Sequence, residues 1–234
     1  MTYSDYVAIL QKLLTVPTID NVFLSVIPRI IDYAEQRIYR EGQFLATVVT
    51  DSTVALAASS RILPLPSDQR LYVVDDVNVI TPVGTTNPDL GVRNTLTPTT
   101  KEWLNQVWNS AAGAALPQYV ARLNDQTMIV GPWPDQAYQI EFVGTIRPTP
   151  LSAANPTTFL SLYLPDLFVA ASMIFGTGCQ RDFGAQSDDP QAAVSWERVY
   201  GELFASSNME EAKKRWSIGA AMPPPPPAPQ TAVQ

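Results

Sequence analysis

The chain has 234 residues, of which 46% are apolar, so it can bury a sizeable core in one domain or two small ones. It carries 15 basic and 22 acidic residues, and the net charge of −7 argues against a surface that grips nucleic acid through clustered lysine and arginine. There is no histidine, which excludes Ser-His-Asp and Cys-His catalysis and every histidine-ligated zinc or iron site.

The remaining global features favour a protein made in a reducing cytoplasm. The single cysteine, Cys179, excludes an internal disulfide, and because it has no CxxC partner we expect a buried, inert thiol. The opening residues MTYSDYVAIL lack the basic segment and apolar run of a signal peptide. The longest apolar run, Leu167–Phe175, is far shorter than the ~20 residues that cross a bilayer, so no membrane partner is expected.

Residues 1–43 predict the N-terminal helices of a bundle. Residues 3–15 form the first helix, because their apolar side chains recur at helical spacing. Asp20 can cap a second helix that ends at Gly42, and Pro28 inside it predicts either a kink or the true start of the helix. The apolar stripe of this second helix consists of Ile27, Ile31, Ala34 and Ile38.

The stretch IIDYAEQRIYRE at residues 30–41 contains the first candidate site. Asp32 and Glu35 are three residues apart, so they share a helix face, and they could form an acid/base pair or a solvated, partner-binding face. Neighbouring arginines lower the pKa of carboxyl groups, which is the opposite of what a general acid needs. We therefore interpret the stretch as a subunit interface formed by Arg29, Asp32, Glu35, Arg37, Arg40 and Glu41.

Residues 44–150 predict a β-rich insertion with one short helix. Residues 44–82 are rich in β-branched side chains and suggest strands, and residues 83–98 suggest a long loop. PTTKEWLNQVWNS predicts a short helix capped by Thr99 or Thr100. A meander of three strands follows, in PQYVARL, QTMIVG and YQIEFVGTIRP. In the last strand Tyr138, Ile140 and Phe142 alternate with Gln139 and Glu141, as in a half-buried antiparallel strand.

No group of side chains in the sequence predicts an active site. Asp75 and Asp76 are adjacent in a predicted strand, so they point to opposite faces and cannot meet on one substrate without a bulge. The five tryptophans are scattered along the chain, which argues against a stacking platform for sugars or bases. The prediction is therefore a protein that is not an enzyme and has no catalytic residue, cofactor or metal. A carboxylate-dependent hydrolase is kept as an alternative, which two acids converging in a deep pocket would favour.

Residues 151–216 predict the C-terminal helices of the bundle. PDLFVAASMIFGTGCQ is apolar nearly all round, so it should be the buried central helix. A long helix follows, with Asp189 as its cap and Pro190 in its first turn. Its buried stripe should consist of Trp196, Tyr200, Leu203 and Phe204. Its exposed end should carry two ion pairs at i,i+4 spacing, Glu210–Lys214 and Glu211–Arg215.

Residues 217–234 end in a polyproline-type tail that has too few apolar side chains to form a core. We predict that this tail lies against a neighbouring subunit or another protein. The expected contact residues are Trp216, Ile218, Met222, Pro223, Pro224, Pro225, Pro226 and Pro227. The predicted fold class is thus α+β: a helical bundle from both chain ends, an inserted antiparallel β region and an extended Pro-rich C-terminal tail.

The sequence also resembles a family of tailed-bacteriophage head-to-tail adaptor (connector) proteins, through IDYAEQRIYRE, GPWPD, RPTPLSAANPTTFLSLYLPDLFVAASM and RDFGAQSDDPQAAVSWE. The resemblance implies a helical bundle with a β insertion, assembled in the host cytoplasm and located at the head-tail interface of the virion. It implies a homo-oligomeric ring, a dodecamer, that joins the portal protein to a tail or nozzle protein. The expected partner of the Pro-rich tail is then a neighbouring subunit or the portal protein. DNA would pass through an acidic lumen without specific binding. A tail-completion or gatekeeper ring is the alternative within this class.

Overall fold

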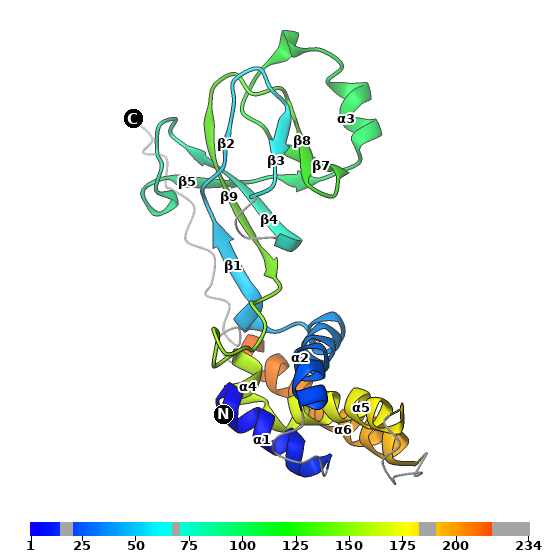
Figure 1. The fold of residues 1–234 in the computed structure, drawn as a ribbon. Coiled ribbons are helices and arrows are strands. Elements are labelled where there is room, and N and C mark those ends of the chain that lie inside the picture. Colours follow the sequence, from blue (N-terminus) through cyan, green and yellow to red (C-terminus); the bar gives the residue numbers. More distant parts are fainter. Residues whose placement is uncertain (15–20, 67–70, 183–190, 217–234) are drawn as a thin grey trace. The chain divides into compact units, whose positions relative to one another are not determined.

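A computed structural model describes residues 1–14, 21–66, 71–182 and 191–216. These residues belong to two compact units, a helical unit formed by residues 1–45 with the chain from Thr149 onward, and a β unit formed by residues 46–148. In the sequence colours of Figure 1, helices α1 and α2 precede the strands of the β unit, and helices α4, α5 and α6 follow them. The predicted fold class, a bundle from both chain ends with an inserted β region, is confirmed. The expectations for Asp20, Asp189, Pro190, the Cys179 side chain and residues 217–234 lie outside the described residues.

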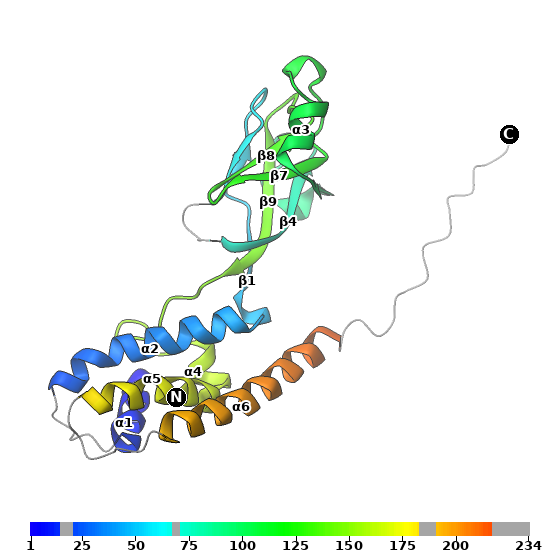
Figure 2. The ribbon, with the colours of Figure 1, turned by 90° about the vertical axis from the view of Figure 1, so that its right-hand side faces the viewer.

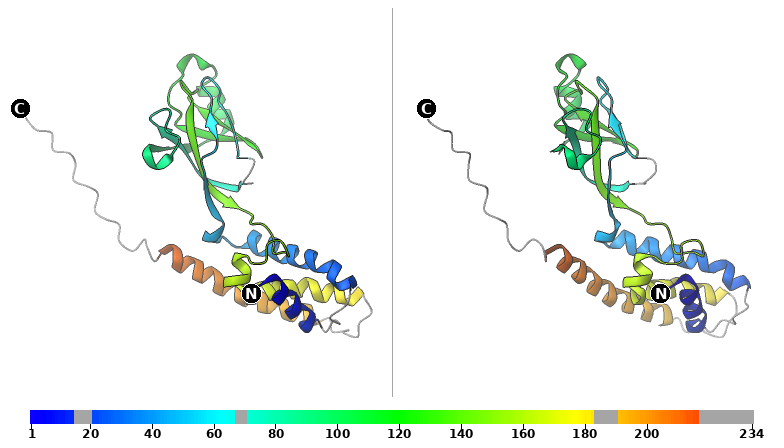
Figure 3. Two further views of the ribbon diagram at one scale, coloured as in Figure 1. Left: turned by 60° about the vertical axis from the view of Figure 1, so that its left-hand side comes forward. Right: turned by 90° about the vertical axis from the view of Figure 1, so that its left-hand side faces the viewer.

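The helical unit packs its helices around α5, which spans Pro165–Asp182. Figures 2 and 3 show α2, Asn21–Glu41, and α6, Gln191–Trp216, running alongside it. Two shorter helices, α1 at Tyr3–Leu13 and α4 at Phe159–Tyr163, also contact α5. The core combines apolar side chains of all five helices, among them Tyr6, Leu10, Ile27, Ile31, Ile38, Leu160, Phe168 and Tyr200. The central position predicted for α5 is confirmed.

The short helix α1 is fixed at both its start and its inner face. Thr2 and Asp5 form a capping box, in which each side chain bonds the backbone N–H of the other residue. The Tyr6 ring stacks on Phe168 of α5 with 4.4 Å between the ring centroids. The Tyr6 hydroxyl donates to the Phe168 carbonyl oxygen at 3.0 Å and also bonds the Ser172 hydroxyl. These contacts satisfy a polar group that burial would otherwise leave without a partner.

The β unit contains two sheets. The first has the order β1-β9-β4-β5, with β2 also paired to β9, and all its pairs are antiparallel. Its strands are β1 Val48–Asp51, β2 Ala55–Leu56, β4 Leu71–Thr81, β5 Val92–Thr95 and β9 Tyr138–Ile146. The second sheet has the order β3-β8-β7-β6. Its strands are β3 Ile62–Pro64, β6 Thr97–Pro98, β7 Tyr119–Asn124 and β8 Thr127–Gly131.

One helix, α3 at Lys101–Val107, belongs to the β unit and packs on β7 and β8. The Thr100 hydroxyl caps it by accepting from the Trp103 N–H, as the sequence predicted for this position. Its Leu104 side chain is buried against Ala121 of β7 and Ile129 of β8. Short 3-10 helices lie at Leu45–Thr47, Pro88–Leu90 and Ala111–Gly113.

Two predictions for the β insertion are wrong. Residues 83–98 do not form one loop, because β5 and β6 lie within them. The three strands after α3 do not form a meander either: β7 pairs with β8, but β9 pairs with β4 and β1 in the other sheet. Strands that follow one another in the sequence can belong to different sheets. The alternation of apolar and polar residues determines which face of a strand is buried, but it does not determine which strand pairs with it.

Of the two alternatives that the sequence left open at Pro28, a kink or the start of the helix, the start is excluded, because α2 begins at Asn21 and continues through that proline. The prediction for Glu211 and Arg215 is wrong. Glu211 does not lie on an exposed helix end paired with Arg215. It is 4% exposed, and Arg215 instead donates to the backbone carbonyl of Gln43 at 2.9 Å. The other predicted pair, Glu210 with Lys214, is present at 3.0 Å.

Among the described residues, no helix combines the length and apolar character that a membrane span requires.

Candidate functional site

The surface formed by α2 and α6 contains most of the charged residues that the sequence singled out. Arg37 of α2 does not point to solvent: its guanidinium donates to Glu197 of α6 at 2.9 Å and to Glu41 at 3.1 Å. It also lies over the Tyr200 ring, 4.3 Å from the centroid. The Tyr200 hydroxyl donates to Glu41 at 2.6 Å, which closes a network across the two helices. Arg37 and Glu41 therefore join α2 to α6 within one subunit.

The charges in this network act on one another as expected for a partly buried ion pair. The hydrogen bonds from Arg37 lower the pKa of Glu197, and the same contacts raise the pKa of Arg37. Arg37 is a bidentate donor to Glu197, an arrangement that is stronger and more specific than a single lysine contact. Replacing Arg37 should consequently disturb the packing of α6 on α2.

Glu35 was expected on the same charged surface, and this prediction is wrong. Its side chain is buried, with 4% exposed, and one carboxylate oxygen accepts the Leu151 N–H at 3.1 Å. Burial raises the pKa of Glu35 to about 7, a shift that the Leu151 hydrogen bond partly opposes. The direction is the opposite of the one inferred from its arginine neighbours in sequence.

A second buried carboxylate, Glu211 of α6, also accepts a hydrogen bond from a backbone N–H in the helical unit. It accepts the Leu45 N–H at 3.0 Å and a hydrogen bond from Lys214 at 2.7 Å. Leu45 is the last residue of the helical unit before the β unit, and Leu151 lies just after the chain returns. Glu35 and Glu211 thus bind the backbone at the two junctions of the insertion.

The remaining candidate interface residues lie on the outside of α2. Arg29, Asp32 and Arg40 are exposed, and within the described residues they form no ion pair. Asp32 accepts from the Gln36 amide nitrogen at 2.8 Å. Exposed apolar side chains accompany these charges, including Val22, 52% exposed, and Tyr33, 39% exposed. The structure therefore divides the six predicted residues into three that are outward and three that are used inside the subunit.

The outer face of α6 has a similar mixed character. Val194 and Met209 are each 62% exposed, and Arg198 pairs with Glu202 at 3.1 Å on the surface. Trp216, predicted to anchor the tail, is 75% exposed at the end of the helix. The other predicted tail contacts, Ile218, Met222 and Pro223–Pro227, lie outside the described residues.

Asp75 and Asp76 of β4 line one surface pocket together. The register of β4 is irregular between Val74 and Asp76, which is the bulge that the two side chains need in order to share a face. Both side chains are exposed, so they do not form the deep acidic pocket that would favour a carboxylate-dependent hydrolase. The described residues contain no group of three or more Asp, Glu, Cys or His side chains that could hold a metal ion. Glu141, expected to face outward, is buried, and Arg93 and Asn78 donate to it at 2.8 Å and 2.9 Å.

Sequence reasoning also missed an aromatic cluster, because it judged the tryptophans to be scattered. Trp103, Trp108 and Tyr119 contact one another with 5.0–5.3 Å between ring centroids. The Trp133 indole N–H donates to the Trp108 carbonyl oxygen at 3.2 Å, which joins a third tryptophan to the group. Trp103 lies on α3, Trp108 is the residue that caps the end of this helix, and Trp133 follows β8, so no local spacing indicated the cluster.

The outward helix faces of mixed charge and apolar character and the partly exposed aromatic cluster are suited to contacts with other proteins. The particular family follows from comparison with known sequences. The chain belongs to the SU10 adaptor protein family, whose model matches residues 1–224. This family is one of phage head-to-tail adaptors, so the resemblance noted in the sequence is confirmed and the chain is a phage virion adaptor. A comparison with curated proteins found no match.

Proposed function

We propose that copies of this adaptor form a closed ring, a dodecamer, between the portal protein and the tail or nozzle protein of the virion, and that DNA passes through its lumen. Ring closure needs a heterologous contact, in which one face of a subunit binds a different face of the next. The outer faces of α2 and α6 are two such faces within one helical unit. The net charge of −7 suits a passage for DNA, because few cations are available to hold the phosphates.

One observation carries the proposal: Arg29, Asp32 and Arg40 remain outward on α2, whereas the adjacent Arg37 and Glu41 are used to bind α6. Within the described residues Arg29 and Arg40 form no ion pair, and exposed apolar side chains flank them, so these charges are available to a neighbouring copy. Such rim contacts contribute only ~0–1 kcal/mol each, so the ring should depend on several of them and on salt. The role that we propose is structural and requires no catalytic step.

Negative-stain images of the purified protein, alone and mixed with portal protein, test the proposal directly. The Arg29→Glu/Arg40→Glu variant should give fewer rings and a stronger dependence on salt. Lys12→Glu/Lys101→Glu is the matched control, because it changes the net charge equally at exposed positions of α1 and α3, outside the proposed faces of α2 and α6. Unchanged ring yield in the first variant would refute the α2 contact. Rings that bind tail protein but not portal would instead identify a tail-completion ring.

A further inference from the structure

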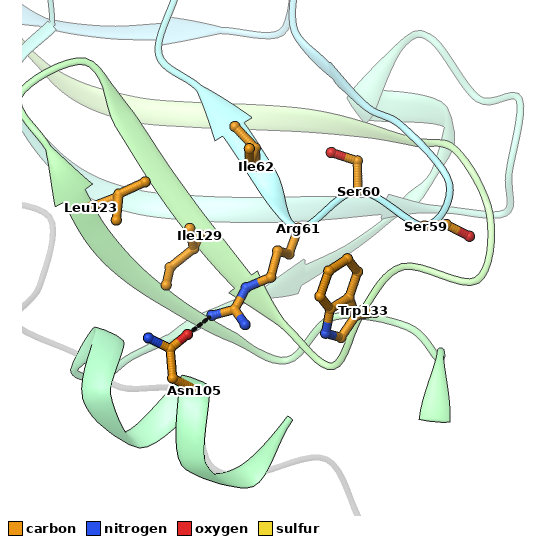
Figure 4. Close-up of a pocket in the computed structure, with 8 residues that line it drawn as sticks. All are labelled: Ser59, Ser60, Arg61, Ile62, Asn105, Leu123, Ile129 and Trp133. Carbon is orange, nitrogen blue, oxygen red and sulfur yellow. Dashed lines mark hydrogen bonds between the residues drawn. The ribbon is translucent and has the colours of Figure 1, made fainter. Parts of the chain in front are cut away.

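The β unit has a shallow pocket of about 390 Å³ between β3, α3 and the residues around Trp133. Figure 4 shows Ile62, Ile129 and Leu123 on one side, Trp133 at the other end, and Arg61 extended between them. Its apolar side chains are partly open to solvent, since Ile62 is 56% and Leu123 43% exposed. The pocket adjoins the aromatic cluster, because Trp108 and Trp133 are joined by a hydrogen bond.

Hydrogen bonds within the β unit fix the side chains that line this pocket. The Arg61 guanidinium donates to the Asn105 side-chain oxygen at 2.7 Å and to the Trp108 carbonyl oxygen at 3.4 Å. It also lies over the Trp133 ring, 5.6 Å from the centroid. With its oxygen bound to Arg61, the Asn105 amide is oriented so that its nitrogen remains as a donor. Within the described chain, no residue accepts from that nitrogen.

The lining therefore offers apolar surface and hydrogen-bond donors, and it contains no acidic side chain. The donors are the Arg61 guanidinium, the Asn105 amide and the hydroxyl groups of Ser59 and Ser60. A matching ligand would present apolar surface and hydrogen-bond acceptors, and it would have few donors of its own. A polyproline segment has this chemistry, because proline has a carbonyl acceptor but no backbone N–H. Aromatic-lined grooves are a common way to bind such segments.

The chain itself contains a segment of this kind, PPPPPAP at residues 223–229. We propose that residues 223–229 of a neighbouring copy bind the Trp133–Arg61 pocket of the β unit. A polyproline helix has three residues per turn, so every third proline ring faces one side and can pack against the apolar lining. Polyproline sequences favour an extended helix in the unbound state, so binding such a segment costs little conformational entropy. This inference rests on the ring proposed above, which supplies the neighbouring copy.

The length of the segment is sufficient for contact between copies. The chain continues for 18 residues beyond Trp216, the last described residue of α6. The segment proposed to dock ends at Pro229, 13 residues beyond Trp216. At ~3.1 Å per residue in a polyproline helix, these 13 residues span up to ~40 Å, which exceeds the ~30 Å diameter of a small domain. A tail that binds the next copy around a ring would link each subunit to its neighbour in addition to the helix faces.

Cross-linking of the full-length protein tests the proposal. In a Cys179→Ser background, one chain carries Ile62→Cys and a second chain carries Pro225→Cys, and a short bismaleimide reagent is added to the mixture. We expect a linked pair of two different chains. Val92→Cys replaces Ile62→Cys in the matched control, because Val92 is 63% exposed on β5, away from the pocket. Its yield should be several-fold lower.

Two further changes probe the chemistry of the pocket. Asn105→Asp should lower the cross-linking yield, because it replaces the free donor by an acceptor while keeping a partner for Arg61. An excess of synthetic peptide 217–234 should compete, whereas the same peptide with serine in place of proline should not. Equal yields at Ile62 and Val92 would overturn the proposal. So would linkage of Pro225→Cys only to added portal protein. Rings seen by microscopy without the cross-link would reject this docking and leave the proposed ring intact, whereas absence of rings would reject the proposed function itself.

Discussion

Replacement of the buried Glu35 gives a specific prediction about stability and pH. The pKa of this carboxyl is about 7 in the folded protein and 4.5 in its ordinary state. Because the folded-state pKa is the higher one, the folded protein holds the proton more tightly than the unfolded chain. The resulting stability is fully present below pH 4.5 and is lost as the pH rises through 7. The difference corresponds to a loss of ~3 kcal/mol in the free energy of unfolding.

Glu35→Gln should remove this dependence. Glutamine keeps an oxygen that can accept the Leu151 N–H, and it stays neutral at every pH. Between pH 5 and pH 8 the variant should therefore gain roughly 3 kcal/mol relative to the wild type. Glu35→Ala should be less stable at pH 5 by ~1–3 kcal/mol, because it leaves the buried Leu151 N–H without an acceptor. The chain has no histidine, the side chain that ordinarily titrates between pH 5 and pH 8, so the contribution of Glu35 is easier to isolate in this range.

Urea denaturation of the two variants and the wild type at pH 5, 6, 7 and 8 measures the effect. Hydrogen exchange at the Leu151 amide supplies a local readout, because the exchange rate should rise in Glu35→Ala and change little in Glu35→Gln at pH 5. Asp32→Asn is the matched control, since it removes an exposed carboxylate three residues away and should retain most of the pH dependence. Parallel pH profiles of the wild type and Glu35→Gln would refute the reasoning.

Three further predictions concern other buried polar groups. The Tyr39 hydroxyl is buried with no hydrogen-bond partner among the described residues, so Tyr39→Phe should leave stability unchanged or raise it by up to ~1 kcal/mol in thermal unfolding. Glu211→Ala should lower stability by ~1–3 kcal/mol and speed hydrogen exchange at the Leu45 amide, which loses its acceptor. Arg93 lowers the pKa of Glu141, so this carboxylate stabilises the β unit at neutral pH, and the effect is lost as the pH falls below 4.5. Arg93→Ala should therefore lower the melting temperature at pH 7 more than at pH 4, and an equal change at both values would contradict this.

The sequence was sufficient for the elements that depend on local patterns. The stripe of α2, the apolar α5 and the Thr100 cap were predicted because helical period and capping chemistry act within one or two turns. Their positions also predicted the helical bundle. The partner of each strand could not be predicted in the same way, since β9 pairs with strands that lie far away in sequence.

The misplacement of Glu35 has a similar physical cause. Glu35 follows Ile31 by four residues and precedes Ile38 by three, so helical spacing alone puts it beside the buried stripe. Its charge was read as a sign of exposure because carboxylates are rarely buried without a partner. The partner is the backbone of Leu151, 116 residues away, and no local pattern indicates that contact. Trp133 entered the aromatic cluster by the same kind of long-range packing.

Helices α2 and α6 have two roles in this arrangement: their inner faces bind the chain at both ends of the β insertion, and their outer faces are exposed. The chain passes from the helical unit to the β unit after Leu45 and returns at Thr149, so these two backbone segments connect the units. A mechanical force on the β unit would act on both segments. Glu35 on α2 holds one segment at Leu151, and Glu211 on α6 holds the other at Leu45. The outer faces of the same two helices are those that we propose to contact neighbouring copies. In the ring that we propose, the same pair of helices would therefore join the β insertion to the neighbouring copies.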